Sequence, residues 1–336
     1  MNERYKFSEN RKPIDQLEFS ENELKTINNL GLTSEDLQKL ISGPSFAEGS
    51  YALIFELPSK DQKNIAKVWK NPRQDSERAD HENVVLRLLR MRKSREIPQS
   101  KGFLKSATIL FEEKIEGKHI ENFDRITINQ LAETLTKIHS IKLNAYGKPL
   151  TKRKKGTKLD YLNSELDRLR VACSSVTKQS EITSSIKMVI NETESEAKKK
   201  AEAFQDNNFT LIHFDLNSNN ILRSADNRIV IIDWEQASAG DNAMDIAKLF
   251  LKLNFNEEQK KYFITKYEKG ISKKDSYFRD RLEIFEPLVL ANSILWRLRV
   301  LKDEPQETSS ANENQFYTRV KNNLDKELVM LKKYLS

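Results

Sequence analysis

The chain has 336 residues, of which 38% are hydrophobic and 32% charged, and its formal net charge is +7. This length suits one bilobal enzyme or two small domains, and the composition indicates a globular protein with a charge-rich surface. No apolar run approaches the roughly 18 residues of a membrane-spanning helix, and the single cysteine, Cys173, excludes an internal disulfide and a cysteine-based metal site.

The first 40 residues are polar and contain two helix-start signatures. Residues 19–24 and 32–37 each place a serine or threonine ahead of acidic residues and a leucine, which is typical of a helix N-terminus. We expect residues 1–40 to form a helical lead-in packed on the sheet that follows. Residues 1–12 lack the apolar core of a signal peptide, so we expect a cytoplasmic protein.

Residues 41–69 have the pattern of a small antiparallel sheet. The runs Tyr51–Leu57 and Ile65–Trp69 are predicted strands. The preceding segment, Ile41–Ala52, contains only two glycines, but Ser50 and exposed backbone N–H groups there could cradle a phosphate. An ordinary β-turn is the alternative interpretation of this segment.

A lysine and a glutamate in this region are candidates for one ion pair. Lys67 lies in the apolar strand Ile65–Trp69 and can face inward. Residues Asp80–Leu89 place apolar side chains at helical spacing, and Glu82 lies near their core-facing stripe. We predict that Lys67 and Glu82 pair. Taken alone, Lys67 could equally be an ordinary strand-edge lysine.

The rest of the chain is predicted to be mainly helical. Thr108–Gly117 reads as a strand, and Leu131–His139 as a helix. Residues 157–205 contain no glycine or proline and predict two long helices with a break near residues 173–185. Phe278–Leu301 predicts a further helix, and residues 308–336 a polar linker followed by a charged terminal helix.

Residues 211–235 carry the strongest chemical signal. A short apolar strand leads to Asp215, Asn220 follows five positions later, and a second strand ends at Asp233. Turn-forming residues at 225–227 predict a hairpin, which would bring Asn220 near Asp233. An amide and a carboxylate suit Mg²⁺, which prefers oxygen ligands and is shared with substrate phosphates. Asp215 is left to orient a hydroxyl, so the set fits phosphoryl transfer from a nucleotide.

These residues resemble the aminoglycoside phosphotransferase and choline kinase family. The resemblance rests on His213–Leu222 and Ile232–Glu235, and on residues 239–247 with the aspartate of a G-D-x-x-x-D segment at Asp245. It implies an α+β, bilobal, protein-kinase-like fold with a small antiparallel-sheet lobe and a mainly helical lobe. It also implies ATP and Mg²⁺ as cofactors. By this resemblance Asp215 is the catalytic base and Asp245 a structural carboxylate, and Asn220 and Asp233 are the Mg²⁺ ligands.

The resemblance extends to the nucleotide side. Lys67, paired with Glu82, would hold the α- and β-phosphates, as in the V-A-I-K pattern of kinases. Backbone groups of Glu113 and Ile115 would bind adenine, with Ser50 at the phosphates. The expected domains are a lead-in over residues 1–40, an N-lobe over 41–116 with a hinge near 112–116, and a C-lobe over 117–336 containing the catalytic hairpin 211–235.

Three departures from kinase patterns bear on the alternatives. Phe214 stands where family members usually carry a small or polar residue, and Asn217–Asn219 replaces their usual His-Pro-Gly. Protein kinases carry an arginine before the catalytic aspartate and follow the metal-binding aspartate with Phe-Gly, whereas here Phe214 precedes Asp215 and Trp-Glu follows Asp233. These differences argue against a protein kinase, which remains the nearer of two alternatives. A non-catalytic nucleotide-binding protein is the more distant one.

The acceptor is expected to be a small molecule with a hydroxyl group, but its identity stays open. A cationic acceptor would need carboxylates, for which Glu235, Glu283 and Glu286 are candidates by position. Asn292, Trp296 and Arg299 fall near one helical face and could line an acceptor pocket, with core packing as the alternative for Trp296.

Two basic runs, at residues 152–155 and 198–200, have acidic neighbours and predict a solvated surface. We therefore expect neither a nucleic-acid partner nor a membrane. Whether the basic runs contact another partner, the preference for ATP over GTP and the oligomeric state are left open.

Overall fold

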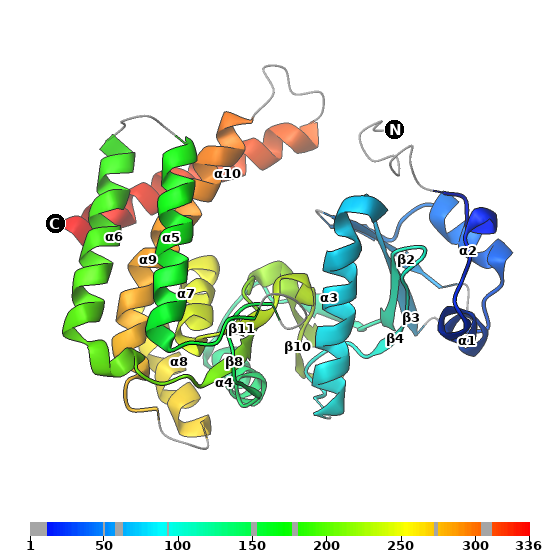
Figure 1. Ribbon diagram of the computed structural model, residues 1–336, viewed down its shortest axis with the longest axis horizontal. Helices are drawn as coiled ribbons and strands as arrows, with labels where there is room; N and C mark the ends of the chain where they lie inside the picture. The colour runs from blue at the N-terminus through cyan, green and yellow to red at the C-terminus, as the bar shows by residue number, and fades with distance from the viewer. Residues whose placement is uncertain are drawn as a thin grey trace. The chain divides into compact units, whose positions relative to one another are not determined.

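The computed structural model (Figure 1) describes residues 12–49, 51–57, 63–92, 94–148, 153–176, 181–271, 275–303 and 311–336. The chain folds into two compact units. Unit 1 comprises Met1–Ile138, Lys148–Arg153 and Asn217–Ser238, and unit 2 comprises the rest. The residues predicted to hold nucleotide and metal fall in unit 1, and Asp215 falls in unit 2.

Unit 1 begins with two short helices, α1 (Glu21–Asn29) and α2 (Ser34–Ser42). Each starts at a capping box, with Ser20 and Glu23 at the first and Thr33 and Asp36 at the second. Reciprocal side-chain bonds satisfy backbone N–H groups that an uncapped helix would leave free. Both helices begin where the sequence carries a helix-start signature, and the lead-in as a domain over residues 1–40 stays a prediction.

An antiparallel sheet of five strands forms the centre of unit 1. Its order is β1-β2-β3-β5-β4. The strands are β1 (Ala47–Glu48), β2 (Ala52–Glu56), β3 (Asn64–Trp69), β4 (Ser100–Leu104) and β5 (Ile109–Glu113). One apolar core joins this sheet to the lead-in helices, because Leu37 and Ile41 cluster with Phe55, Val68 and Phe111.

The register of the sheet decides which side chains share a face. Lys67 on β3 pairs with Leu110 on β5, and Ile65 pairs with Glu112. Side chains alternate between faces along a strand, so Lys67 and Glu112 project from the same face. Both are buried, and this places a lysine and a carboxylate together under helix α3.

Helix α3 (Pro72–Met91) is longer than the predicted segment 80–89. Asn71 caps its N-terminus and Pro72 occupies the first turn, a combination that favours a helix start. The additional N-terminal turns contain Arg78, which donates to Glu235. Glu82, inside the predicted segment, is completely buried.

A second, three-stranded sheet in unit 1 has the order β10-β9-β6, with β6 at Gly117–His119, β9 at Ile221–Ser224 and β10 at Ile229–Ile231.

Unit 2 is mainly helical, with one small sheet ordered β11-β8-β7. The strands are β7 (Lys142–Leu143), β8 (Phe209–Ile212) and β11 (Ser238–Gly240), and helix α4 (Arg125–His139) leads into the unit. The remaining helices are α5 (Lys158–Val176), α6 (Glu181–Lys199), α7 (Asn242–Leu253), α8 (Glu257–Gly270), α9 (Phe278–Lys302) and α10 (Ala311–Leu335).

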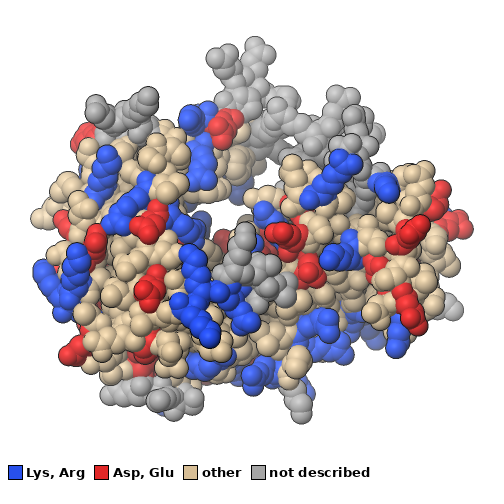
Figure 2. Space-filling model, viewed as in Figure 1, with Lys and Arg blue, Asp and Glu red and all other residues tan. Residues whose placement is uncertain are grey.

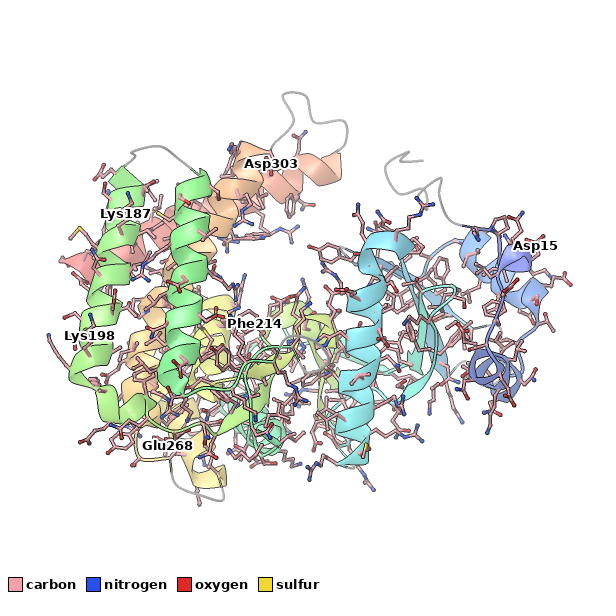
Figure 3. All side chains as sticks on the ribbon, in the orientation of Figure 1. Asp15, Lys187, Lys198, Phe214, Glu268 and Asp303 are labelled. Carbon is pink, nitrogen blue, oxygen red and sulfur yellow. The ribbon has the colours of Figure 1, made fainter. Side chains whose placement is uncertain are left out.

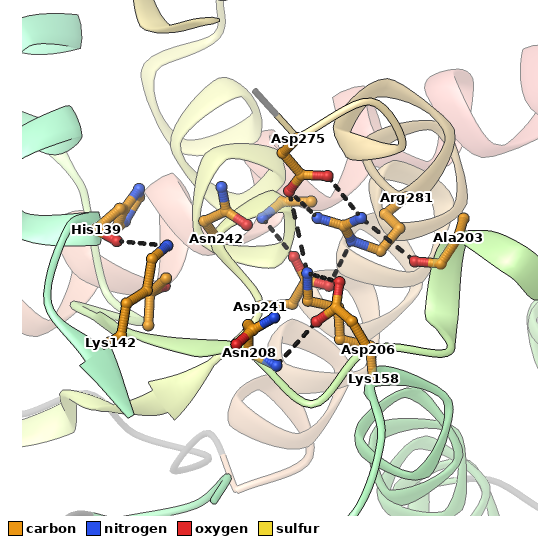
Figure 4. Close-up of polar contacts among 12 residues, drawn as sticks. His139, Lys142, Lys158, Ala203, Asp206, Asn208, Asp241, Asn242, Asp275 and Arg281 are labelled. Carbon is orange, nitrogen blue, oxygen red and sulfur yellow. Dashed lines mark hydrogen bonds and ion pairs between the residues drawn. The ribbon is translucent and has the colours of Figure 1, made fainter. Parts of the chain in front are cut away.

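Helix α9 is the central element of unit 2, because helices α5, α6, α7 and α10 all pack against it. Its Arg281 is fully buried and donates to Asp241, at the start of α7, and to Asp275. These bonds are part of a polar network shown in Figure 4. A guanidinium without solvent requires such partners, so the network fixes α7 to α9.

The fold class predicted from the sequence is confirmed, with an antiparallel sheet in the N-terminal part and helices in the C-terminal part. The two long helices predicted within 157–205 are α5 and α6, and the terminal helix is α10. Strands β4 and β6 and helix α8 were not predicted. The domain boundaries at residues 40 and 116 stay a prediction. Within the part of the chain that the structure describes, no helix is long and apolar enough to cross a membrane.

Candidate active site

The hairpin of β9 and β10 brings the ends of its two strands together in unit 1. The backbone N–H of Ile232 donates to the carbonyl of Asn220 at 3.0 Å. Asn220 is buried, and Asp233 follows Ile232 directly in a left-handed conformation with φ of 65°. A left-handed non-glycine residue is strained and is held by its surroundings. The predicted proximity of Asn220 and Asp233 therefore follows from one hairpin.

Lys67 lies at the centre of a charged cluster in unit 1. Its Nζ donates to Glu82 Oε2 at 2.7 Å and to Asp233 Oδ1 at 2.6 Å. The predicted Lys67–Glu82 ion pair is thus present. Glu82 has a second role, because its Oε1 accepts the backbone N–H of Trp234 at 3.0 Å. One glutamate therefore positions both the lysine and the backbone that follows Asp233.

More acidic than basic groups surround this lysine. Burial opposes the charged form of Lys67, but Glu82 and Asp233 raise its pKa well above the usual value. Burial raises the pKa of Glu82 to about 8 and that of Glu112 to about 7, with Lys67 opposing both changes. One ammonium thus serves several buried carboxyl groups, and a divalent cation would relieve their repulsion.

Two further residues belong to this cluster: Glu112 was not predicted as a site residue, and Glu235 was predicted only as a candidate for binding a cationic acceptor. Glu112 gave no signal because it lies in an apolar strand next to a second glutamate. Glu235 accepts from Arg78 at 3.1 Å, and the Arg78 guanidinium lies 3.6 Å from the centroid of the Tyr51 ring. This stack connects α3 to the segment preceding β2.

The predicted adenine-binding backbone lies at the end of β5. The Glu113 N–H donates to the Gln99 carbonyl at 2.9 Å and is therefore already engaged. Ile115 follows beyond the strand and is half-buried. Binding of adenine by Glu113 and Ile115 stays a prediction. Ser50, expected at the phosphates, lies outside the described residues.

Unit 2 holds the predicted catalytic aspartate in a loop anchored to helix α7. The backbone N–H groups of His213 and Phe214 donate to the two oxygens of Asp245, at 2.9 and 2.7 Å. Burial opposes ionisation of Asp245, but the hydrogen bond from His139 and these backbone bonds hold its pKa below the usual value. Asp245 is therefore a buried anion that fixes the backbone immediately before Asp215.

The environment of His213 and Phe214 explains why this loop keeps one shape. His213 is fully buried, and its Nδ1 accepts the Asp215 N–H at 3.3 Å. Phe214 has φ of 67°, a strained conformation for a bulky residue. Its carbonyl accepts from Lys248 at 3.1 Å. The ring of Phe214, labelled in Figure 3, has its centroid 3.1 Å from the Lys248 ammonium and 5.8 Å from the Arg168 guanidinium. The unusual Phe214 thus has two cations near its ring.

The donor set in unit 1 fits Mg²⁺. Asn220 and Asp233 offer an amide and a carboxylate oxygen, and the Asp233 side chain is 38% exposed. Carboxylate oxygens of Glu82, Asp233 and Glu235 also lie within 4.8 Å of one another. Hard oxygen ligands beside a lysine match a metal shared with phosphates.

The chain was compared with families of known proteins. The model of the choline/ethanolamine kinase family matches residues 99–301, which is more than half of the chain. The matched range contains Asp215, Asn220 and Asp233, and it ends within helix α9. No curated protein sequence matches the chain.

Among the solved structures with a similar fold are an ethanolamine kinase, a choline kinase and an aminoglycoside phosphotransferase. Plasmodium vivax ethanolamine kinase is 17% identical with a TM-score of 0.59, covering 86% of this chain and 82% of its own. Choline kinase from Cryptosporidium parvum is 18% identical, with a TM-score of 0.58 and coverage of 87% and 89%. The streptomycin–ATP–APH(2'')-IIa ternary complex is 17% identical, with a TM-score of 0.54 and coverage of 89% and 94%. The protein-kinase-like fold predicted from the sequence is thereby confirmed.

Proposed function

The chain belongs to the choline/ethanolamine kinase family of small-molecule phosphotransferases, and on that basis we propose that it transfers the γ-phosphate of ATP to a hydroxyl group in an Mg²⁺-dependent reaction. The observation that supports this most strongly is the Lys67 cluster. The Lys67 ammonium contacts both Glu82 on α3 and Asp233 after β10. This connection of strand, helix and metal-binding aspartate is what a kinase needs to hold a nucleotide.

In unit 1, the proposed roles follow from the contacts. Lys67 binds the α- and β-phosphates, and Glu82 holds the ammonium in place. Asn220 and Asp233 bind Mg²⁺, which when bound neutralises charge on the phosphates. Backbone groups of Glu113 and Ile115 bind the adenine ring.

In unit 2, Asp215 is proposed to orient the acceptor hydroxyl and to accept its proton as the oxygen attacks the γ-phosphorus. The bond from that phosphorus to the bridging oxygen breaks, and ADP leaves. Asp245 and His213 fix the backbone before Asp215 through the bonds described above. They are positioning residues, since they act through Asp215.

The proposal is tested by phosphate transfer from [γ-³²P]ATP to a panel of hydroxyl metabolites and, in parallel, to protein acceptors. We expect Mg²⁺-dependent labelling of a small molecule and none of protein. Labelling of protein alone would indicate a protein kinase instead. Nucleotide binding without transfer to any acceptor would indicate a non-catalytic nucleotide-binding protein.

A further inference from the structure

The carboxylates considered for a cationic acceptor each have a basic partner. Glu235 pairs with Arg78 at 3.1 Å, Glu283 with Lys200 at 2.6 Å, and Glu286 with Lys260 at 2.8 Å. A paired carboxylate attracts a second cation only weakly, because its charge is already balanced. None of these three candidates for recognising a positively charged acceptor is therefore an unpaired carboxylate.

Two lysines on α7, in contrast to these paired carboxylates, form no ion pair among the described residues. Lys248 and Lys252 are four positions apart and share one face of the helix. The Lys248 ammonium lies 3.1 Å from the carbonyl oxygen of Phe214, the residue just before Asp215, and Lys252 lies 5.7 Å from the ring centroid of Trp296. Among the residues that the structure describes, neither lysine has a carboxylate oxygen within 4.0 Å.

A small cavity in unit 2 opens beside Lys248, between α5, α7 and α9. Its polar lining consists of Glu165, Arg168, Lys248 and Asn292, and the remainder is apolar. Glu165 accepts two bonds from Arg168, at 2.8 and 2.9 Å, so these two charges balance each other. Lys248 forms no ion pair among the described residues, and its ammonium is held by the Phe214 carbonyl and ring. Asn292, a candidate from the sequence, lies here, whereas Arg299 is exposed farther along α9.

The electrostatic setting supports a role in binding. Desolvation lowers the pKa of Lys248 to about 8, with Glu165, Asp245 and Asp215 opposing the change. Desolvation also lowers the pKa of Lys252, and Asp215 again opposes it. Both lysines are thus within electrostatic range of Asp215, and Trp296 beside Lys252 is 43% exposed. An anionic ligand would give Lys248 a charged partner beside the Phe214 carbonyl, and it could also be reached by Lys252, whose side chain is exposed.

We infer that the phosphate acceptor carries an anionic group, a carboxylate or a phosphate, and that Lys248 and Lys252 bind this group beside Asp215. The inference rests on the proposed function, because it assigns the substrate class of the same site. A hydroxyl and an anion on one small molecule would then be held by one loop and one helix of unit 2. The names of the similar structures point to choline, ethanolamine and streptomycin, so this chain would differ from them in acceptor charge.

The test is steady-state kinetics with Mg²⁺-ATP and acceptors of three charges. Glycerate and glycerol 3-phosphate represent anions, glycerol and glucose neutral compounds, and choline and ethanolamine cations. We expect the highest kcat/KM with an anionic acceptor. In Lys252→Ala the ratio of kcat/KM for anionic over neutral acceptors should fall at least about 10-fold, as for loss of one charged hydrogen bond. Lys252→Glu should lower the ratio further.

A matched control is Lys261→Ala on α8, which removes an exposed lysine outside the cavity. This variant should keep the wild-type ratio. Preference of the wild type for choline or ethanolamine over every anion would overturn the inference while supporting the proposed function. An equal loss for all acceptors in Lys252→Ala would also overturn it, because a purely structural lysine would act in that way. Transfer to no acceptor would instead contradict the proposed function.

Discussion

The two units treat buried charge in opposite ways. In unit 1, one ammonium, that of Lys67, is surrounded by Glu82, Glu112 and Asp233, so negative charge is in excess. In unit 2, the buried Arg281 is matched by Asp241 and Asp275. We propose that the charges of unit 1 serve to bind a ligand, whereas the buried Arg281 network of unit 2 holds helices together.

One basic run on the surface of the helical part is paired with acidic residues. Lys198, Lys199 and Lys200, one of the basic runs seen in the sequence, pair with acidic residues on α6 and α9. Figure 2 shows lysine and arginine interspersed with acidic residues over the visible face. Lys248 and Lys252 on α7 form no ion pair among the described residues, and their closeness to the loop of Asp215 motivates the inference of an anionic acceptor.

The largest expected effect concerns the matched charges of unit 2. Arg281→Met should lower the free energy of unfolding by about 3–5 kcal/mol, because it leaves buried carboxylates without their partner. Urea denaturation followed by circular dichroism measures this change. Arg279→Met, two residues away, is the control, because this arginine is 61% exposed in its pair with Glu268. That variant should lose no more than about 1 kcal/mol.

Equal losses in the two arginine variants would contradict the view that the buried network stabilises unit 2. While folded, Arg281→Met should also keep the wild-type KM for ATP, because the side-chain bonds of Arg281 are to Asp241, Ala203 and Asp275, all within unit 2. A large rise in that KM would break the distinction between the units.

The second prediction concerns the unmatched charges of unit 1. Lys67→Met should lower kcat/KM for ATP by about 10²–10³-fold, the usual cost of removing one charge-stabilising donor. Initial rates over a range of ATP concentrations provide the measurement. Lys63→Met, which removes an exposed lysine just before β3, should stay within a few-fold of the wild type. A similar value for both variants would argue that the cluster is only structural.

The smallest predicted effect is a pH dependence in unit 2. Because the pKa of Lys248 is lowered to about 8, its positive charge is present at pH 7 and is lost as the pH rises above 8. The KM for an anionic acceptor should therefore rise several-fold between pH 7 and pH 9, and that for a neutral acceptor should not. The charges acting on Lys248 are Glu165 and Arg168 on α5, Asp245 on α7 and Asp215 in the loop.

The lowered pKa of Lys248 also affects the free energy of unfolding, which should rise with pH, whereas binding of an anionic acceptor should weaken. Folding lowers the pKa of Lys248 from its ordinary 10.5, so the unfolded chain binds more protons between pH 8 and 10.5. Lys248 therefore disfavours folding below pH 8, and this cost diminishes as the pH rises through that window.

If the KM for an anionic acceptor and the KM for a neutral acceptor change in parallel with pH, the role assigned to Lys248 is wrong.

The parts of the site that the sequence predicted depend on short-range patterns. Asn220 and Asp233 flank a hairpin whose turn lies at residues 225–227, so local spacing determined their proximity. The Lys67–Glu82 pair could be predicted because a strand and the next helix carry them. The start of α3 at Asn71-Pro72 also has a local signal that the prediction over residues 80–89 did not use.

The residues that the sequence did not predict depend on contacts between distant segments. Arg281 is buried because Asp241 and Asp275 approach it from other parts of the chain, and a helical arginine ordinarily faces solvent. Lys248 gave no signal for the same reason. Glu112 is buried beside Lys67 through the pairing of β3 with β5, a register that neither strand specifies alone.

A measurement on Asp215→Asn tests most directly whether Asp215 serves phosphate transfer while residues of unit 1 bind the nucleotide. Titration with ATP and Mg²⁺ by calorimetry gives the nucleotide Kd, and [γ-³²P]ATP transfer gives kcat. We predict a Kd within about two-fold of the wild type and a kcat lower by about 10²–10⁴-fold, the usual contribution of a catalytic base. A variant that keeps kcat within a few-fold of the wild type would contradict the assignment of Asp215 as the residue that orients the hydroxyl.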